Sequence, residues 1–263
     1  MRLVTWNINS VRLRLHQLAR LVRDLEPDVV CLQETKVANG SFPRRAIEEM
    51  GYAHQLIHGM KSYNGIAILS KRPFGEPPRR DWCGKQDCRH GVVAFASGLE
   101  VHNFYVPAGG DVPDPDANDK FAHKLAFVDE MADVFAQANG APKVLVGDLN
   151  IAPLENDVWS HKQLLKIVSH TPVEVEKYTR AQAAHDWVDA VRHFVPAEEK
   201  LYTWWSYRAR DWQAADRGRR LDHVWVTPDL TGRLQAARVL KETRGWEQPS
   251  DHAPVVVDIG VEM

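Results

Sequence analysis

Lys143-Val144-Leu145-Val146-Gly147-Asp148-Leu149-Asn150 places a short apolar run directly before an acid and an amide. The run from Val144 to Gly147 predicts a buried β-strand. Asp148 and Asn150 are two residues apart, so an extended backbone points both side chains to the same side. A carboxylate beside a carboxamide can hold a hard cation or orient a water molecule. Asp and Asn also end strands simply because they form turns, so this stretch alone leaves both interpretations open.

The composition indicates an ordinary soluble domain. The chain has 263 residues, 44% of them hydrophobic and 26% charged, and its net charge is −2. A polyanionic partner must therefore meet a local basic patch. The cysteines Cys31, Cys83 and Cys88 lack paired metal spacing, which favours reduced thiols and a cytoplasmic location. The apolar run of the N-terminus is too short for a signal peptide, and no segment has the length of a membrane span.

Strand and helix patterns alternate along both halves of the chain. A strand over 2–8, a helical pattern from Val11 to Leu25 with Ser10 as its N-cap, and a strand over 28–34 form a βαβ-like opening. Further helices are predicted over 120–139, 159–168 and 180–194, the last with a Thr179/Gln182 capping box. No linker separates the halves. We expect one domain over residues 1–263, with two stacked sheets and helices outside.

Several separated strand ends and loops carry side chains that can do chemistry. They are Asn7, Glu34, Tyr105, Asp148, Asn150, Asp222, Asp251 and His252. Each also has a structural explanation: Asn7 could cap a turn, Tyr105 could be core, and Asp222 could pair with Arg219 or Arg220. Their shared position at chain reversals beside apolar strands is where open α/β sheets place ligands.

Six short motifs, taken in order, resemble the exonuclease III / abasic-site endonuclease family of the endonuclease/exonuclease/phosphatase superfamily. They are Trp6–Ser10 (WNINS), Leu32–Lys36 (LQETK), Tyr105–Pro107 (YVP), Gly147–Asn150 (GDLN), Arg220–Asp222 (RLD) and Ser250–Pro254 (SDHAP). GDLN and SDHAP mark the superfamily, and the first three motifs narrow it to the nuclease branch. The resemblance implies an α+β fold of the DNase I type, a four-layer αββα sandwich with the site at one edge of the paired sheets.

The resemblance also implies a role for each candidate. Glu34 with Asn7 holds a divalent metal, Mg²⁺ or Mn²⁺, and Asp251 is a possible second ligand. Asp148 activates the attacking water, and Tyr105 donates to phosphate or aids the leaving group. His252 contacts the phosphate, and Asp222 fixes the tautomer of His252. Asn150 lies beside the negative charge that develops on the phosphate. Asp148, Asn150 and His252 stay open between metal ligation and proton transfer.

Substrate binding is predicted from a basic, aromatic segment near the C-terminus. Arginines track phosphates, and an aromatic side chain can stack on bases or wedge between them. The candidate patch contains Arg208, Arg210, Arg217, Arg219, Arg220 and Trp212. Its alternative is a merely solvated basic loop. Trp204 and Leu221 match the positions where the family builds a small apolar pocket for a baseless sugar.

One residue departs from the family pattern. Ala108 follows Tyr-Val-Pro, where the family usually carries an amide that can touch phosphate. Ala108 offers no side-chain donor to the phosphate, while the residues that imply the reaction class are all present.

The implied activity is that of a metal-dependent DNA repair phosphodiesterase acting on duplex DNA at abasic sites and 3′ ends. We also expect no membrane partner, and we expect the protein to be a monomer. The alternatives are a superfamily phosphoesterase for inositol phosphates or phospholipids, and a catalytically silent binding module.

Overall fold

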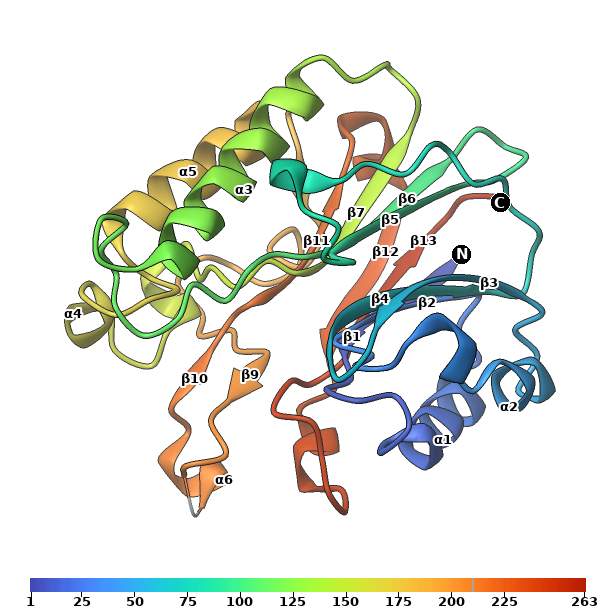
Figure 1. The fold of residues 1–263 in the computed structure, drawn as a ribbon, viewed down its shortest axis with the longest axis horizontal. Coiled ribbons are helices and arrows are strands. Elements are labelled where there is room, and N and C mark those ends of the chain that lie inside the picture. Colours follow the sequence, from blue (N-terminus) through green and yellow to red (C-terminus); the bar gives the residue numbers. More distant parts are fainter. Residues whose placement is uncertain (210) are drawn as a thin grey trace.

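The computed structural model describes residues 1–209 and 211–263, and Figure 1 shows them as two sheets between helices. The first sheet has six strands in the order β12-β13-β1-β2-β4-β3. Their bounds are β1 Arg2–Asn7, β2 Val29–Gln33, β3 His54–Met60, β4 Tyr63–Ser70, β12 Leu234–Val239 and β13 Val255–Ile259. The strand-helix-strand opening is confirmed, because β1 and β2 pair in parallel.

The second sheet has five strands in the order β5-β6-β7-β11-β8. Their bounds are β5 His90–Ala94, β6 Glu100–Tyr105, β7 Lys143–Asp148, β8 Val188–Asp189 and β11 Asp222–Val226. Strands β5 and β6 form an antiparallel pair, and Tyr105 is the last residue of β6. A separate two-stranded ribbon, β9 Trp204–Trp205 with β10 Gly218–Arg219, projects from the body together with α6 (Figure 1).

Helices cover the outer faces of both sheets. The α-helices are α1 Leu15–Leu25, α2 Arg44–Glu49, α3 Asp119–Ala136, α4 His161–Leu164, α5 Pro172–Ala183 and α6 Trp212–Ala215. The short 3₁₀ helices are η1 Asn39–Ser41, η2 Trp82–Gly84, η3 Glu155–Asp157, η4 Pro228–Arg233 and η5 Lys241–Gly245. In Figure 1, α1 and α2 lie on one side of the paired sheets, and α3 and α5 lie on the other.

Three apolar layers hold this arrangement together. Alternate residues of facing strands, such as Val29 of β2 and Val144 of β7, fill the space between the sheets. The opposite faces pack against helices, so Leu32 meets the α1 side and Leu145 meets the α3–α5 side. Because each central strand is apolar on both faces, it reads in sequence as a continuous hydrophobic run. The predicted αββα sandwich is confirmed.

Strand direction brings the functional candidates to one edge. Parallel pairing brings the ends of β1 and β2 together in one sheet and those of β6 and β7 together in the other, and the contact of Asn7 with Asp148 joins the two pairs at one edge. Strand β11 runs antiparallel to β7 and therefore begins at that edge, with Asp222 directly opposite Asp148. Strand β13 is antiparallel to β1, so the segment before it, which holds His252, returns there as well.

The predicted helix over 180–194 is wrong. Helix α5 spans Pro172–Ala183, and its capping box is Thr171 with Glu174 rather than Thr179 with Gln182. The hydroxyl of Thr179 lies inside the helix and donates to the Val175 carbonyl. The chain leaves the helix early because Val188–Asp189 must pair with β11.

Other helix boundaries also differ from the predictions. The helix predicted over 159–168 shrinks to α4 His161–Leu164. Ser10 is not an N-cap, because α1 begins at Leu15 and the intervening residues form a turn held by the Arg14 side chain. Helix α3 is confirmed, with Asn118 as its N-cap. Within residues 1–209 and 211–263, none of the helices combines the length and hydrophobicity needed to cross a bilayer.

Candidate active site

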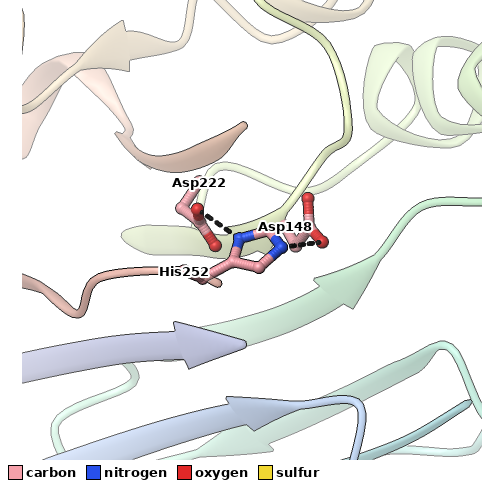
Figure 2. A group of neighbouring side chains, drawn as sticks. All are labelled: Asp148, Asp222 and His252. Carbon is pink, nitrogen blue, oxygen red and sulfur yellow. Dashed lines mark hydrogen bonds and ion pairs between the residues drawn. The ribbon is translucent and has the colours of Figure 1, made fainter. Parts of the chain in front are cut away.

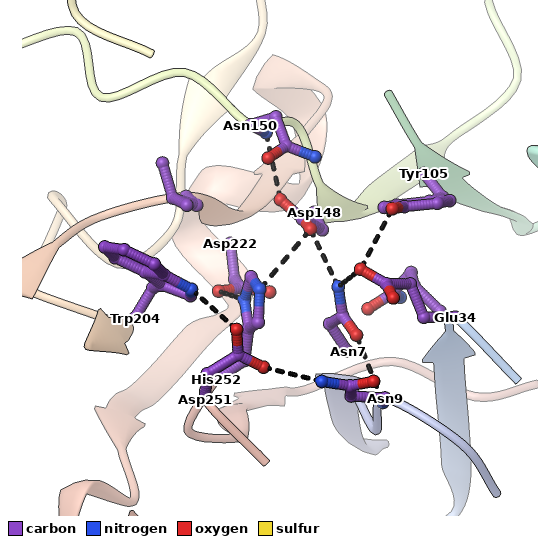
Figure 3. A network of polar contacts seen from close by, with 12 residues as sticks. Asn7, Asn9, Glu34, Tyr105, Asp148, Asn150, Trp204, Asp222, Asp251 and His252 are labelled. Carbon is purple, nitrogen blue, oxygen red and sulfur yellow. Dashed lines mark hydrogen bonds and ion pairs between the residues drawn. The ribbon is translucent and has the colours of Figure 1, made fainter. Parts of the chain in front are cut away.

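The predicted site residues at the strand ends converge in one polar network (Figure 3). Asn7 ends β1, Tyr105 ends β6, and Asp148 ends β7. The backbone turns sharply just beyond these ends, where Glu34 and Asn150 both have positive φ angles, of 50° and 55°. Such angles strain non-glycine residues, and they recur where a side chain must be aimed into a site. The spatial convergence that the sequence pattern suggested is therefore present.

Asp148 is the buried centre of this network. Its carboxylate accepts a hydrogen bond from the Asn7 side-chain amide at 2.9 Å and one from the Asn150 backbone amide at 3.0 Å. The side chain of Asn150 is held in turn, because its Nδ2 donates to the Val106 carbonyl at 2.9 Å. These donors fix the orientation of a carboxylate that is 1% exposed.

His252 lies between two carboxylates, as Figure 2 shows. Its Nδ1 donates to Asp222 at 2.8 Å, and its Nε2 faces Asp148 at 3.6 Å. Asp222 is held by the Thr203 hydroxyl at 2.6 Å. An imidazole whose Nδ1 proton is bound by a carboxylate presents its Nε2 to the site in a fixed orientation.

Burial and charge shift the pKa values of these groups in ways that suit proton transfer. Burial raises the pKa of Asp148 above its ordinary value, despite the opposing charge of His252. Burial disfavours the charged form of His252 too, but the charges of Asp222 and Asp148 outweigh it and raise the His252 pKa. The two shifts favour the charged form of His252 and make the Asp148 carboxylate bind a proton more readily than usual.

Glu34 lies across the network from His252. It accepts hydrogen bonds from the Asn7 amide and the Tyr105 hydroxyl, both at 2.9 Å, and it pairs with Lys36 at 2.7 Å. Burial opposes its ionisation, but Lys36 and Asn7 lower its pKa below the ordinary value. Burial, with the charge of Glu34, raises the Tyr105 pKa, so the phenol stays a proton donor at neutral pH.

Asp251 joins the network to the aromatic wall of the site. Its carboxylate accepts from the Asn9 side chain and from the Trp204 indole, both at 3.0 Å. These contacts and the charge of His252 lower the Asp251 pKa, although its burial opposes this. Trp204 is thus oriented by one of the acidic residues that the sequence singled out.

A cleft of about 740 Å³ opens above the network. Its floor includes Glu34, Asp148 and His252, and its walls include Ala108, Trp204, Arg208, Trp212, Arg219 and Leu221. The Arg219 guanidinium lies over the Trp204 ring at 5.3 Å, and Arg217 lies over Trp159 at 4.8 Å. The structure therefore brings the predicted basic and aromatic residues to the mouth of the acidic floor.

One of the predicted basic residues, Arg220, is buried. Arg220 is not part of this surface, because it is 0% exposed and forms ion pairs with Asp157 and Asp189. A guanidinium can be buried at this position only because two carboxylates surround it. Arg210 lies outside the described residues.

Sequence reasoning missed three residues of the network. Lys36 bridges Glu34 and Asn9, and it stands in the LQETK motif without an assigned role. Asn9 follows Asn7 at the spacing that places both on one side of the chain, which is a usable signal. Thr203 carries no signal, because its contact with Asp222 depends on how distant segments pack.

The donor set suits a hard divalent cation. Asp148, Asp222 and His252 each bring one ligand atom within 4.8 Å of the others. Among the described residues, Asp222 Oδ1 is buried without a hydrogen-bond partner. A buried carboxylate oxygen with no partner is costly, and a nearby cation would compensate it. Together with Glu34, Asn7 and Asp251, the site offers mainly oxygen ligands, the type that Mg²⁺ and Mn²⁺ prefer.

Comparison with known proteins identifies the family to which this fold belongs. The sequence model of the Endonuclease/Exonuclease/phosphatase family matches residues 4–252. The chain is 30% identical to exodeoxyribonuclease III of Haemophilus influenzae, over 97% of this chain and 98% of that protein. This chain belongs to the exodeoxyribonuclease III and abasic-site endonuclease family.

Solved structures of family members superpose closely on the sandwich. An AP endonuclease from Archaeoglobus fulgidus matches with a TM-score of 0.92 and 30% identity, covering 99% of this chain and 100% of that chain. A 3′ phosphatase from Neisseria, solved with a product DNA hairpin, matches with a TM-score of 0.85 and 32% identity, covering 98% of this chain and 99% of that chain. The family fold therefore extends over nearly the whole of this protein.

Proposed function

We propose that this protein is a DNA repair phosphodiesterase that requires Mg²⁺ or Mn²⁺. It cuts duplex DNA 5′ to abasic sites and removes nucleotides or blocking groups from 3′ ends. The observation that carries this proposal is the pairing of buried Asp148 with His252, held by Asp222, at the floor of a cleft with arginines in its walls.

Asp148 is the group that activates water. Its carboxylate is oriented by Asn7 and Asn150, and its raised pKa makes it a better proton acceptor. It takes a proton from water as the water oxygen bonds to phosphorus. The bond from phosphorus to the 3′ oxygen breaks in line, and that oxygen leaves as a 3′ hydroxyl after protonation.

The remaining polar groups stabilise charge on the phosphate. The His252 imidazolium places a positive charge beside Asp148, where the phosphate must come for attack. Tyr105 stays protonated and can donate to a phosphate oxygen or to the leaving oxygen. Donors that are already oriented need no reorganisation during the reaction, which is the main source of this kind of stabilisation.

Glu34 and Asn7 are the proposed residues that hold the metal, with Asp251 as a further ligand. When bound, the metal neutralises phosphate charge and lowers the barrier to attack. Lys36 forms an ion pair with one oxygen of Glu34 and lowers the pKa of this carboxyl group. Glu34 is therefore ionised, as a ligand for a cation must be.

The cleft walls are proposed to bind the DNA. Arg208 and Arg219 lie where the phosphates flanking the scissile bond would pass. Trp204 and Leu221 form an apolar patch beside the acidic floor that would accept a sugar without a base. The AP endonuclease and the DNA-bound 3′ phosphatase among the relatives support both parts of the proposed activity.

The direct test uses a labelled duplex with one abasic-site analogue and a second duplex with a 3′ phosphate. Incubation with Mg²⁺ should shorten the first strand at the 5′ side of the lesion and dephosphorylate the second, and EDTA should abolish both reactions. A phosphoinositide serves as the competing substrate. Hydrolysis of the phosphoinositide with both duplexes left intact would replace the nuclease proposal with the lipid phosphatase alternative.

A further inference from the structure

A buried lysine lies directly behind the site. Lys124 of α3 is 0% exposed, and its ammonium nitrogen donates to the Asn150 carbonyl at 2.7 Å and to the Ala108 carbonyl at 3.3 Å. Its third partner is the carboxylate of Glu174 on α5. An ammonium has three N–H donors, so these acceptors use its whole capacity.

Glu174 anchors a different loop with the same carboxylate. It accepts from the Ser169 backbone amide with both oxygens at 2.9 Å, and from the Thr171 hydroxyl at 2.7 Å. Ser169 is joined to the cleft wall, because the Arg219 guanidinium donates to its hydroxyl at 2.8 Å. A continuous chain of contacts thus runs from Asn150 through the Lys124–Glu174 pair to Arg219.

The three loops tied by this pair all line the cleft. They supply Ala108, Asn150 and Ser169 to its walls. The first loop also packs tightly on the lysine stem: a Cβ on Gly109 would lie 2.9 Å from Lys124 Cδ and 3.0 Å from Val168 Cγ1, at a φ of +90°. Only glycine fits there. Neither charged side chain lines the cleft itself, so the pair acts on substrate only through these loops.

We propose that the buried Lys124–Glu174 ion pair is a positioning device that sets Asn150 and the Ala108 loop against the scissile phosphate. The inference rests on the proposed phosphodiesterase function. The Asn150 backbone amide orients Asp148, so holding the Asn150 carbonyl from behind also controls the proton acceptor.

A charge-neutral double variant separates positioning from simple stability. Lys124→Met removes the donors to Asn150 and Ala108, and Glu174→Gln keeps an oxygen that accepts from Ser169 and Thr171. The K124M/E174Q protein therefore has no unpaired buried charge, the usual reason that such variants unfold. Its unfolding in urea is measured first, and kinetics are run where it is fully folded.

We expect the turnover of an abasic-analogue duplex by K124M/E174Q to fall about 10²-fold with little change in KM, because displacement of catalytic groups by about 1 Å has this effect. The same variant in an Asn150→Ala background should lose less, because the positioned Asn150 side chain is absent, while the part of the loss that acts through Ala108 and the Asn150 backbone remains. Equal losses in both backgrounds would overturn the proposal.

Lys143→Met is the matched control. Lys143 is also a buried lysine that donates to backbone carbonyls, those of Asn139 and Ala141, but it lies at the opposite end of β7 from Asp148. We expect K143M to lose stability while keeping turnover. Equal loss of turnover in K143M and K124M/E174Q would show a general effect of core damage and overturn the positioning role.

A crystal structure of K124M/E174Q tests the inference without any assay. We expect the Asn150 carbonyl and Ala108 to move while Ser169 stays. Unmoved Asn150 and Ala108 would overturn the inference even if the wild-type protein cuts abasic DNA. Failure of the wild-type protein to cut would count against the proposed function alone.

Discussion

Asp148 and Asp222 lie directly opposite each other in the antiparallel pair of β7 and β11, as the last residue of one strand and the first of the other. His252 bridges them, with Nδ1 on Asp222 and Nε2 toward Asp148. Two buried carboxylates this close repel each other unless a cation lies between them. The register of one strand pair thus creates both the proposed proton acceptor and the need for a charged histidine.

Replacing Asp148 by Asn should lower the turnover of an abasic duplex by about 10²–10⁴-fold, because the amide cannot accept a proton from water. Steady-state kinetics with Mg²⁺ measure this loss. Asp258→Asn is the control, since Asp258 pairs with Arg2 far along β13 from the site. Near-normal cutting by D148N would remove Asp148 from the proposed role.

Replacing Thr203 by Val should lower turnover by about 10–100-fold, the usual effect of removing a partner that orients a functional histidine or its carboxylate. The Asp222 carboxylate loses its hydroxyl donor and holds His252 less firmly. The matched control is Thr227→Val, a buried threonine beyond the far end of β11 that caps the Lys143 backbone amide. If both variants keep full turnover, Thr203 has no positioning role.

Replacing Arg208 by Gln should weaken duplex binding and reduce the salt dependence of binding by about one ion. The arginine lines the cleft, so its loss removes one proposed phosphate contact while the acidic floor stays intact. Fluorescence anisotropy at several salt concentrations, with EDTA present, measures this slope. Arg23→Gln, an exposed change in the last turn of α1, should leave it unchanged. Equal slopes for R208Q and the wild-type protein would exclude this contact.

The protein should lose stability as the pH falls below about 6.5. Burial, with the nearby charge of His102, holds the pKa of His90 well below its ordinary value. Below that pH the histidine binds a proton in the unfolded chain but not in the native state. Each such group lowers the free energy of unfolding by up to about 1.4 kcal/mol per pH unit. This stability is present above the unfolded pKa and is lost toward the lower folded pKa.

Urea unfolding at a series of pH values measures this slope. His90→Gln should make this slope shallower between pH 6.5 and 5, even if the variant is less stable overall. The reason is that unfolding of the variant no longer takes up the proton of His90. His193→Gln, at an exposed position, should leave the slope unchanged. A slope in H90Q as steep as in the wild-type protein would assign the acid sensitivity to other groups.

Local sequence patterns predicted a helix or strand correctly where only one interpretation of the segment was possible. The apolar run before Asp148 became β7, and the amphipathic pattern after Asn118 became α3. The patterns predicted a capping box at Thr179/Gln182, which is wrong, whereas Thr171/Glu174, with the same spacing eight residues earlier, caps α5. Both pairs have the residue types and spacing of a capping box. The pairing of β8 with β11 selected Thr171/Glu174, because it requires the chain to leave the helix before Val188.

In the candidate site, too, the sequence predicted some features and the packing of distant segments decided others. Acids and amides at strand ends marked Asn7, Glu34, Asp148 and Asp222, because a polar side chain at either end of an apolar strand is visible in sequence. Partners were not visible. Thr203 reaches Asp222, while Arg220, one arginine among several in its segment, turns inward to Asp157 and Asp189.

The sequence by itself therefore determined which residues end strands, which faces are apolar and to which family the chain is similar. Only the tertiary structure decided which charges meet, which are buried and which line the cleft. The physical reason is range. Strand and helix patterns depend on neighbours a few residues away, whereas the contacts of Asp148 with Asn7 and His252, or of Lys124 with Glu174, exist only after segments far apart in the sequence have packed together.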